Sequence, residues 1–137
     1  MNAIIAPVFV QIALTFVVLI AMGSSRVRAA RSREIRAALA SGQSSSYGRT
    51  ADLLSDNLKN QFEVPVLFYA AIGLTIASES VTPFLTVLAW AYVILRVVHA
   101  IVHVTINHIR TRFLVFLISS LVLMLYWIVF GIELFRS

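Results

Sequence analysis

The 137-residue sequence contains no cysteine. Disulfide bonds, thiolate metal sites and cysteine nucleophiles are therefore excluded, and any sulfur chemistry must come from a ligand. Charge is also scarce, because Asp, Glu, Lys and Arg make up 12% of the residues, against about 25% in typical soluble domains. Hydrophobic residues account for 60%, which leaves too little polar surface for a soluble protein of this size. We therefore expect one integral membrane domain over residues 1–137.

The hydrophobic residues occur in long blocks, which we interpret as membrane-spanning helices. The first block, residues 3–22, contains no charged residue and is about as long as a bilayer crossing. No basic segment precedes it and no small-residue cleavage site follows it, so we interpret it as a retained span rather than a signal peptide. Further spans are expected at about 62–77, 81–109 and 113–135. The predicted fold class is an all-α, four-span membrane domain.

Basic residues gather in the loops that follow the first and third spans. The loop 23–61 is rich in them, whereas the turn between the second and third spans has only Glu79. Arg110 and Arg112 follow the third span. By the positive-inside rule, both basic loops are expected to face the cytoplasm and both chain ends the other side. The basic residues of loop 23–61 are Arg26, Arg28, Arg31, Arg33, Arg36, Arg49 and Lys59, and the acidic ones are Glu34, Asp52 and Asp56.

The basic loop is itself predicted to contain helices. The stretch RVRAARSREIRAALASG, residues 26–42, is rich in alanine and arginine and is expected to end at Gly42, which suits a helix C-cap. A second helix is expected to begin near residue 50, with Thr50 or Asp52 as its N-cap. The intervening SGQSSSYGRT is typical of a turn-rich loop.

The third predicted span carries polar side chains in a regular pattern. At about 100° per residue, five of them fall within about 80° of arc on one helix face. Such a stripe can join helices, line a water path or hold a polar ligand, and all three remain open. His108 falls off this face, and Arg112 would do so if the helix continued unbroken. The residues of the stripe are Arg96, His99, His103, Asn107 and Arg110.

Glu63 lies at the start of the second predicted span. Asn57, Asn60 and Glu63 are three residues apart, so they are expected to share one polar ridge. A carboxylate in a membrane helix is costly unless it lies at the interface or pairs with a basic group. Two interpretations follow: an interfacial glutamate in contact with water, and a buried carboxylate paired with an arginine from another helix.

Two segments resemble a known membrane family. They are NQFEVPVLFY at 60–69 and RVVHAIVHVTINHIRTR at 96–112, together with the arginine cluster that begins at Arg26. The N-x-x-E of Asn60 and Glu63 before a proline, and the R-x-x-H of Arg96 and His99, resemble marks of the MAPEG family. These are membrane-associated proteins of eicosanoid and glutathione metabolism. The resemblance extends over essentially the whole chain and is closest to bacterial members similar to microsomal glutathione transferases.

The resemblance implies a left-handed four-helix bundle that forms a homotrimer in a bacterial inner membrane. Glutathione, as co-substrate, would bind between adjacent subunits near the cytoplasmic edge. The resemblance assigns Arg110 or Arg112 to the thiol, and Arg112 is preferred because it follows the stripe at the helix end. His103 stands where many active members have tyrosine, and it is assigned to the catalytic group. The implied glutathione-binding positions are Arg26, Lys59, Asn60, Glu63, Arg96 and His99.

The chemistry of these residue types suits glutathione. Arginines bind carboxylates through a planar fork, and Glu63 suits the ammonium group. A cation near a thiol favours the nucleophilic thiolate. We therefore expect a membrane-bound glutathione transferase or peroxidase that acts on an apolar electrophile or a lipid hydroperoxide. The alternative is a non-catalytic member that binds a lipid or a partner subunit.

Other partners have weaker support in the sequence. His99 and His103 are four residues apart, so both rings could reach one metal or haem, but the sequence suggests no third ligand. No resident metal is therefore expected. We also expect no nucleic-acid partner, and we expect contact with membrane lipids.

Overall fold

The computed structural model describes residues 2–42, 46–106 and 108–136. All regular secondary structure in these residues is α-helical, so the predicted all-α class is confirmed. The helices are α1 (Asn2–Ala30), α2 (Arg33–Ala40), α3 (Arg49–Gln61), α4 (Val64–Ala77), α5 (Pro83–Val104) and α6 (Ile109–Arg136).

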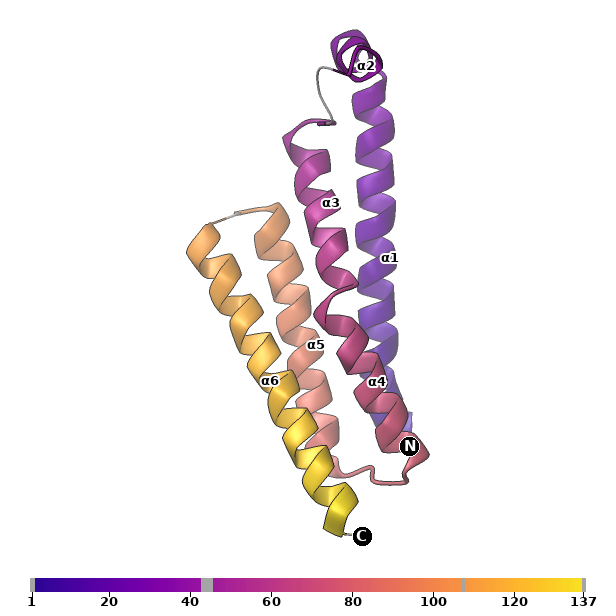
Figure 1. Cartoon of the computed structure of the whole chain (residues 1–137), viewed down its shortest axis with the longest axis vertical. Helices are drawn as coiled ribbons and strands as arrows, with labels where there is room; N and C mark the ends of the chain where they lie inside the picture. Colours follow the sequence, from indigo (N-terminus) through magenta and orange to yellow (C-terminus); the bar gives the residue numbers. More distant parts are fainter. Residues whose placement is uncertain (1, 43–45, 107, 137) are drawn as a thin grey trace.

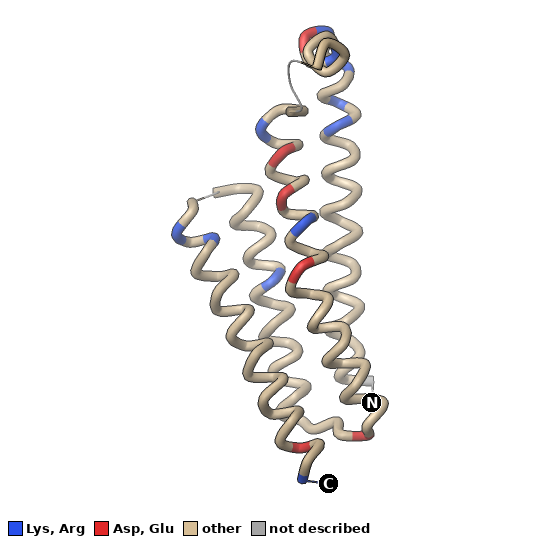
Figure 2. The backbone as a smooth tube through the Cα atoms, viewed as in Figure 1, with Lys and Arg blue, Asp and Glu red and all other residues tan. Residues whose placement is uncertain are grey.

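The long helices run side by side (Figure 1). α3 and α4 follow one another end to end and return beside α1, and α5 and α6 form an antiparallel pair. The short helix α2 lies across the end of α1, at the opposite end from the two chain termini. Lys and Arg also gather toward the α2 end, as Figure 2 shows. The basic loops therefore lie toward one end of the molecule.

Three helices in the described part of the chain are long and apolar enough to cross a membrane. They cover Ala3–Ala30, Pro83–Val104 and Ile109–Arg136. They correspond to the predicted spans 3–22, 81–109 and 113–135, although α1 continues eight residues further and α5 ends five residues earlier. The predicted span 62–77 corresponds to α4, whose 14 residues are fewer than the about 20 that a crossing helix needs.

Pro65 explains the break between α3 and α4. A proline inside a helix lacks the amide hydrogen and clashes with the carbonyl four residues before it, which here belongs to Gln61. α3 ends at that residue, and Glu63 adopts a non-helical backbone with φ −88° and ψ −98° before α4 begins. Pro83 has the opposite effect: it lies in the first turn of α5, where Oγ1 of Thr82 accepts a hydrogen bond from the Leu85 amide at 3.2 Å.

The helices of the basic loop differ from the prediction at their ends. The predicted helix 26–42 is interrupted at Arg31 and Ser32, where α1 gives way to α2. The C-cap is Ser41 rather than Gly42, which takes the following position in the left-handed region with φ +70°. The predicted N-cap of α3 at Thr50 or Asp52 is wrong, because the helix begins at Arg49 with Gly48 as its cap.

The interior divides into an apolar half and a polar half. Near the chain termini, α1, α4, α5 and α6 bury a hydrophobic core, in which the rings of Phe68 and Tyr92 stack at 4.7 Å. Tyr126 bonds Thr75 there at 2.9 Å. Toward the basic end the buried residues become polar, and α3 replaces α4 as the neighbour of α1 and α5. The largest of these buried polar side chains are Gln11, Asn57, Gln61, Arg96, His99 and His103.

Candidate functional site

The buried side-chain amides of Gln11, Gln61 and Asn57 form a series of hydrogen bonds, here called the amide chain, that joins α1, α3 and α5. Gln11 Nε2 donates to Gln61 Oε1 at 2.9 Å, and Gln61 Nε2 donates to Asn57 Oδ1 at 3.1 Å. Asn57 Nδ2 then donates to the Ala100 carbonyl at 3.1 Å. Each of the three side chains is at most 1% exposed. The amide chain fixes the position of α3 between α1 and α5.

The polar ridge predicted for Asn57, Asn60 and Glu63 differs from the arrangement in the structure. Asn57 faces the interior and α5, whereas Asn60 is half-buried and Glu63 is exposed beyond the end of α3. The three residues therefore share no continuous ridge. Sequence reasoning also missed Gln11 and Gln61. A side-chain amide in an otherwise apolar first span was the available signal.

Arg96 is fully buried where α3 ends. Its Nη2 donates to the Asn60 carbonyl at 2.6 Å, so the guanidinium stabilises the negative end of the α3 dipole. Nε and Nη1 of Arg96 have no hydrogen-bond partner among the described residues. A buried cation with unsatisfied donors is costly, which marks this face of α5 as a place for a polar or anionic group.

Glu63 does not supply a buried counter-ion for Arg96. Its side chain is exposed in the single chain, which favours the interpretation of an interfacial glutamate. Among the described residues, an ion pair joins Lys59 to Asp56 at 3.0 Å on the exposed face of α3.

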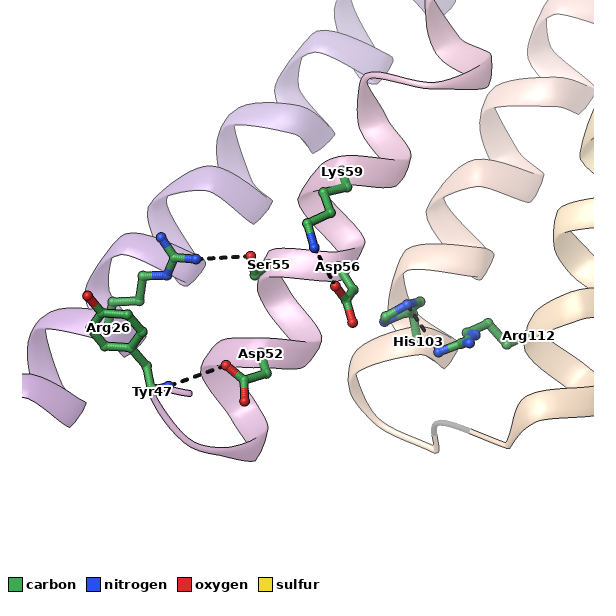
Figure 3. Close-up of polar contacts among 8 residues, drawn as sticks. All are labelled: Arg26, Tyr47, Asp52, Ser55, Asp56, Lys59, His103 and Arg112. Atoms are coloured by element: carbon green, nitrogen blue, oxygen red, sulfur yellow. Dashed lines mark hydrogen bonds and ion pairs between the residues drawn. The ribbon is translucent and has the colours of Figure 1, made fainter. Parts of the chain in front are cut away.

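His99 and His103 lie one turn apart on α5, and both contact Arg112 of α6. His99 Nδ1 lies 3.2 Å from the Arg112 carbonyl, and His103 Nε2 lies 3.3 Å from Arg112 Nη1 (Figure 3 shows the second contact). Both rings are 2% exposed. Arg112 therefore reaches one histidine with its main chain and the other with its side chain.

These two contacts assign the tautomers. A carbonyl only accepts, so His99 carries its hydrogen on Nδ1 and has a lone pair on Nε2. A guanidinium only donates, so His103 has its lone pair on Nε2 and its hydrogen on Nδ1. His99 Nε2 and His103 Nδ1 have no hydrogen-bond partner among the described residues. The site thus offers one buried acceptor and one buried donor.

A cavity of about 410 Å³ connects these groups. Its polar wall combines residues of α3, the α3–α4 junction, α5 and α6, whereas its apolar wall belongs to α6. Such a cavity is large enough for a small peptide-like ligand with one apolar end. The polar wall contains Asp56, Lys59, Asn60, Glu63, His99, His103 and Arg112, and the apolar wall contains Ile109, Phe113 and Phe116.

The structure brings most of the predicted site residues to this cavity. Lys59, Asn60, Glu63, His99, His103 and Arg112 line it, and Arg96 lies behind Asn60. Arg110 does not: α5 ends at Val104, so the predicted stripe is interrupted, and Arg110 is exposed on α6. Asn107, also predicted for the stripe, lies outside the described residues.

Arg26 is separated from the cavity by α3. Its Nη2 donates to Ser55 Oγ at 3.0 Å, and its guanidinium lies 5.2 Å from the centre of the Tyr47 ring. Figure 3 shows Arg26 and Ser55 on one side of α3, with Asp56 and Lys59 on the side of His103 and Arg112. Within one chain, Arg26 and Arg112 therefore do not face the same ligand.

A metal centre finds no support in the part of the chain that the structure describes. It contains no group of three or more His, Asp or Glu side chains that could hold an ion. The rings of His99 and His103 meet edge to face, with centres 5.8 Å apart, and each ring has one nitrogen in contact with Arg112.

A family model described as the MAPEG family matches residues 4–132. The matched region includes all residues that line the cavity, the amide chain and Arg26. No curated protein and no solved structure matches the chain. The match and the three apolar helices identify an integral membrane protein.

Proposed function

We propose, since this chain belongs to the MAPEG family, that it is a membrane-bound glutathione transferase or peroxidase. The cavity between α3, α5 and α6 would bind glutathione and activate its thiol. The observation that carries the proposal is the position of Arg112, whose guanidinium meets a buried imidazole at the wall of that cavity.

The charges of the cavity complement those of glutathione. Lys59 suits a carboxylate, Glu63 the ammonium group, and Arg112 the thiol. A thiol has an unperturbed pKa of about 8.5, and lowering it by about two units corresponds to about 2.7 kcal/mol of preferential stabilisation of the thiolate. Phe113 and Phe116 provide an apolar surface for the electrophile or lipid hydroperoxide.

The remaining carboxylate requires a second chain. Arg26 lies across α3 from the cavity, so it would bind glutathione held by a neighbouring subunit. We therefore propose a homotrimer with glutathione at each subunit boundary. In this assembly α3 and α4 together form the fourth crossing of a four-helix bundle. The basic loops would face the cytoplasm of a bacterial inner membrane.

Ultraviolet difference absorbance of the detergent-purified protein tests the proposal directly. Mixing with glutathione at neutral pH should produce a thiolate signal in the wild type. Arg112→Gln should abolish it, whereas Arg110→Gln, which changes an exposed arginine two residues away, should retain it. If the folded wild type binds glutathione without forming thiolate, the transferase proposal is wrong. The non-catalytic lipid-binding or partner-binding alternative would then be preferred.

A further inference from the structure

The side chain of Arg112 lies next to the imidazole of His103, which can act as a base. Its Nη1 contacts Nε2 of His103 at 3.3 Å, and this nitrogen must bear a lone pair because the guanidinium can only donate. His103 is 2% exposed and lines the same cavity. A thiol that approaches Arg112 therefore also approaches an unprotonated imidazole nitrogen.

We propose that His103 is the proton acceptor for the glutathione thiol, an inference that rests on the proposed function. The thiol enters between Arg112 Nη1 and His103 Nε2. The S–H bond breaks, the Nε2–H bond forms, and both electrons of the S–H bond remain on sulfur. Arg112 transfers its hydrogen bond from Nε2 to the new thiolate.

The surrounding charges couple this proton transfer to thiol binding. A protonated His103 beside the Arg112 guanidinium places two cations together, which is unfavourable without an anion. The thiolate supplies that anion between them. The other charged or titratable groups at this wall are Asp56 and Lys59, which pair with each other at 3.0 Å, and His99, Arg96 and Glu63. Figure 3 shows Asp56 and Lys59 on the side of α3 that faces His103 and Arg112.

Activation by His103 and purely electrostatic activation by Arg112 differ in the number of protons released to solvent. If arginine alone stabilises the thiolate, each thiolate that forms releases one proton to solvent. If His103 accepts the proton, the protein retains it, and thiolate forms with little release. Histidine suits this role because its unperturbed pKa of about 6.5 lies near neutrality.

The experiment counts protons and thiolate together. The full chain in detergent, in weakly buffered solution with a pH-indicator dye, is mixed with glutathione. Proton exchange due to binding itself is subtracted with S-methylglutathione, which has no thiol. His103→Gln and His103→Tyr remove the imidazole, and His108→Gln is the matched control because His108 is an exposed histidine outside the cavity.

We expect wild type and His108→Gln to release close to zero protons per thiolate. In His103→Gln and His103→Tyr the thiolate signal should fall about tenfold or more, which corresponds to one pKa unit or more for the bound thiol. Any thiolate that remains in these variants should release one proton each. Retained binding of S-methylglutathione establishes that a variant is folded, and either variant suffices.

Two results would overturn the inference, and they are distinguishable. If the wild type releases one proton per thiolate, as the His103 variants do, glutathione is activated without His103 and the proposed function stands. If the folded wild type forms no thiolate, the proposed function fails and the inference fails with it.

Discussion

Replacing Gln61 with leucine tests whether the buried amide chain holds α1, α3 and α5 together. Gln61 accepts a hydrogen bond from Gln11 and donates one to Asn57, and all three side chains are at most 1% exposed. The substitution leaves one buried donor and one buried acceptor unsatisfied. Each such group costs about 1–3 kcal/mol, so we expect Gln61→Leu to lower the free energy of unfolding by about 2–6 kcal/mol.

Gln11→Leu is the matched variant at the end of the same chain. It breaks one hydrogen bond instead of two, and it also removes Gln11 Oε1, which has no partner among the described residues. We expect a loss of about 1 kcal/mol or less. The double variant should lose less than the sum of the two, because leucine at both positions removes the unsatisfied donor that Gln61→Leu alone creates.

Unfolding of the detergent-purified chain, followed by circular dichroism, measures these losses. Glutathione affinity is measured in parallel, because the bond from Asn57 to the Ala100 carbonyl fixes the distance between α3 and α5 beside the cavity. Equal losses from the two single variants, with an additive double variant, would refute the reasoning. The amides would then contribute independently rather than as one connected chain.

Two further predictions concern arginines. Arg96→Met removes a buried cation with two unsatisfied nitrogens, so the free energy of unfolding should change by less than about 1 kcal/mol. Glutathione affinity, measured by calorimetry, should nevertheless fall about tenfold. An unchanged affinity would contradict the assignment of Arg96 to glutathione binding. Arg26→Gln and Arg112→Gln chains, each inactive alone, should regain about a quarter of the wild-type activity when co-expressed as random mixed trimers. No recovery in isolated mixed trimers would place both arginines in one chain's site.

The helices were largely predictable because membrane spans depend on local composition. The apolar runs predicted α1, α5 and α6, and Pro65 marks the break before α4. The end of α5 was not predictable in this way. Residues 105–109 include no glycine or proline to mark a helix end, so the hydrophobic pattern suggested a helix to residue 109.

The site residues that were predicted from the sequence are those whose positions depend on local helix geometry. Arg96, His99 and His103 share one helix, so their common face follows from the helical period alone. Arg110 was placed on that face only by continuing α5 past its end. The contact between Gln11 and Gln61 joins residues 50 positions apart, and no local period predicts such a pair.

The turn between α5 and α6 determines the state of both histidines. Arg112 lies in the first turn of α6, where its main chain fixes the tautomer of His99 and its side chain that of His103. A helix rotates by about 100° per residue, so an insertion or deletion of one residue before Ile109 would turn both groups of Arg112 away from α5. The length of that turn is therefore as much a requirement of the site as the residues that line it. Span prediction, which allows a few residues of variation at each helix end, cannot show this requirement.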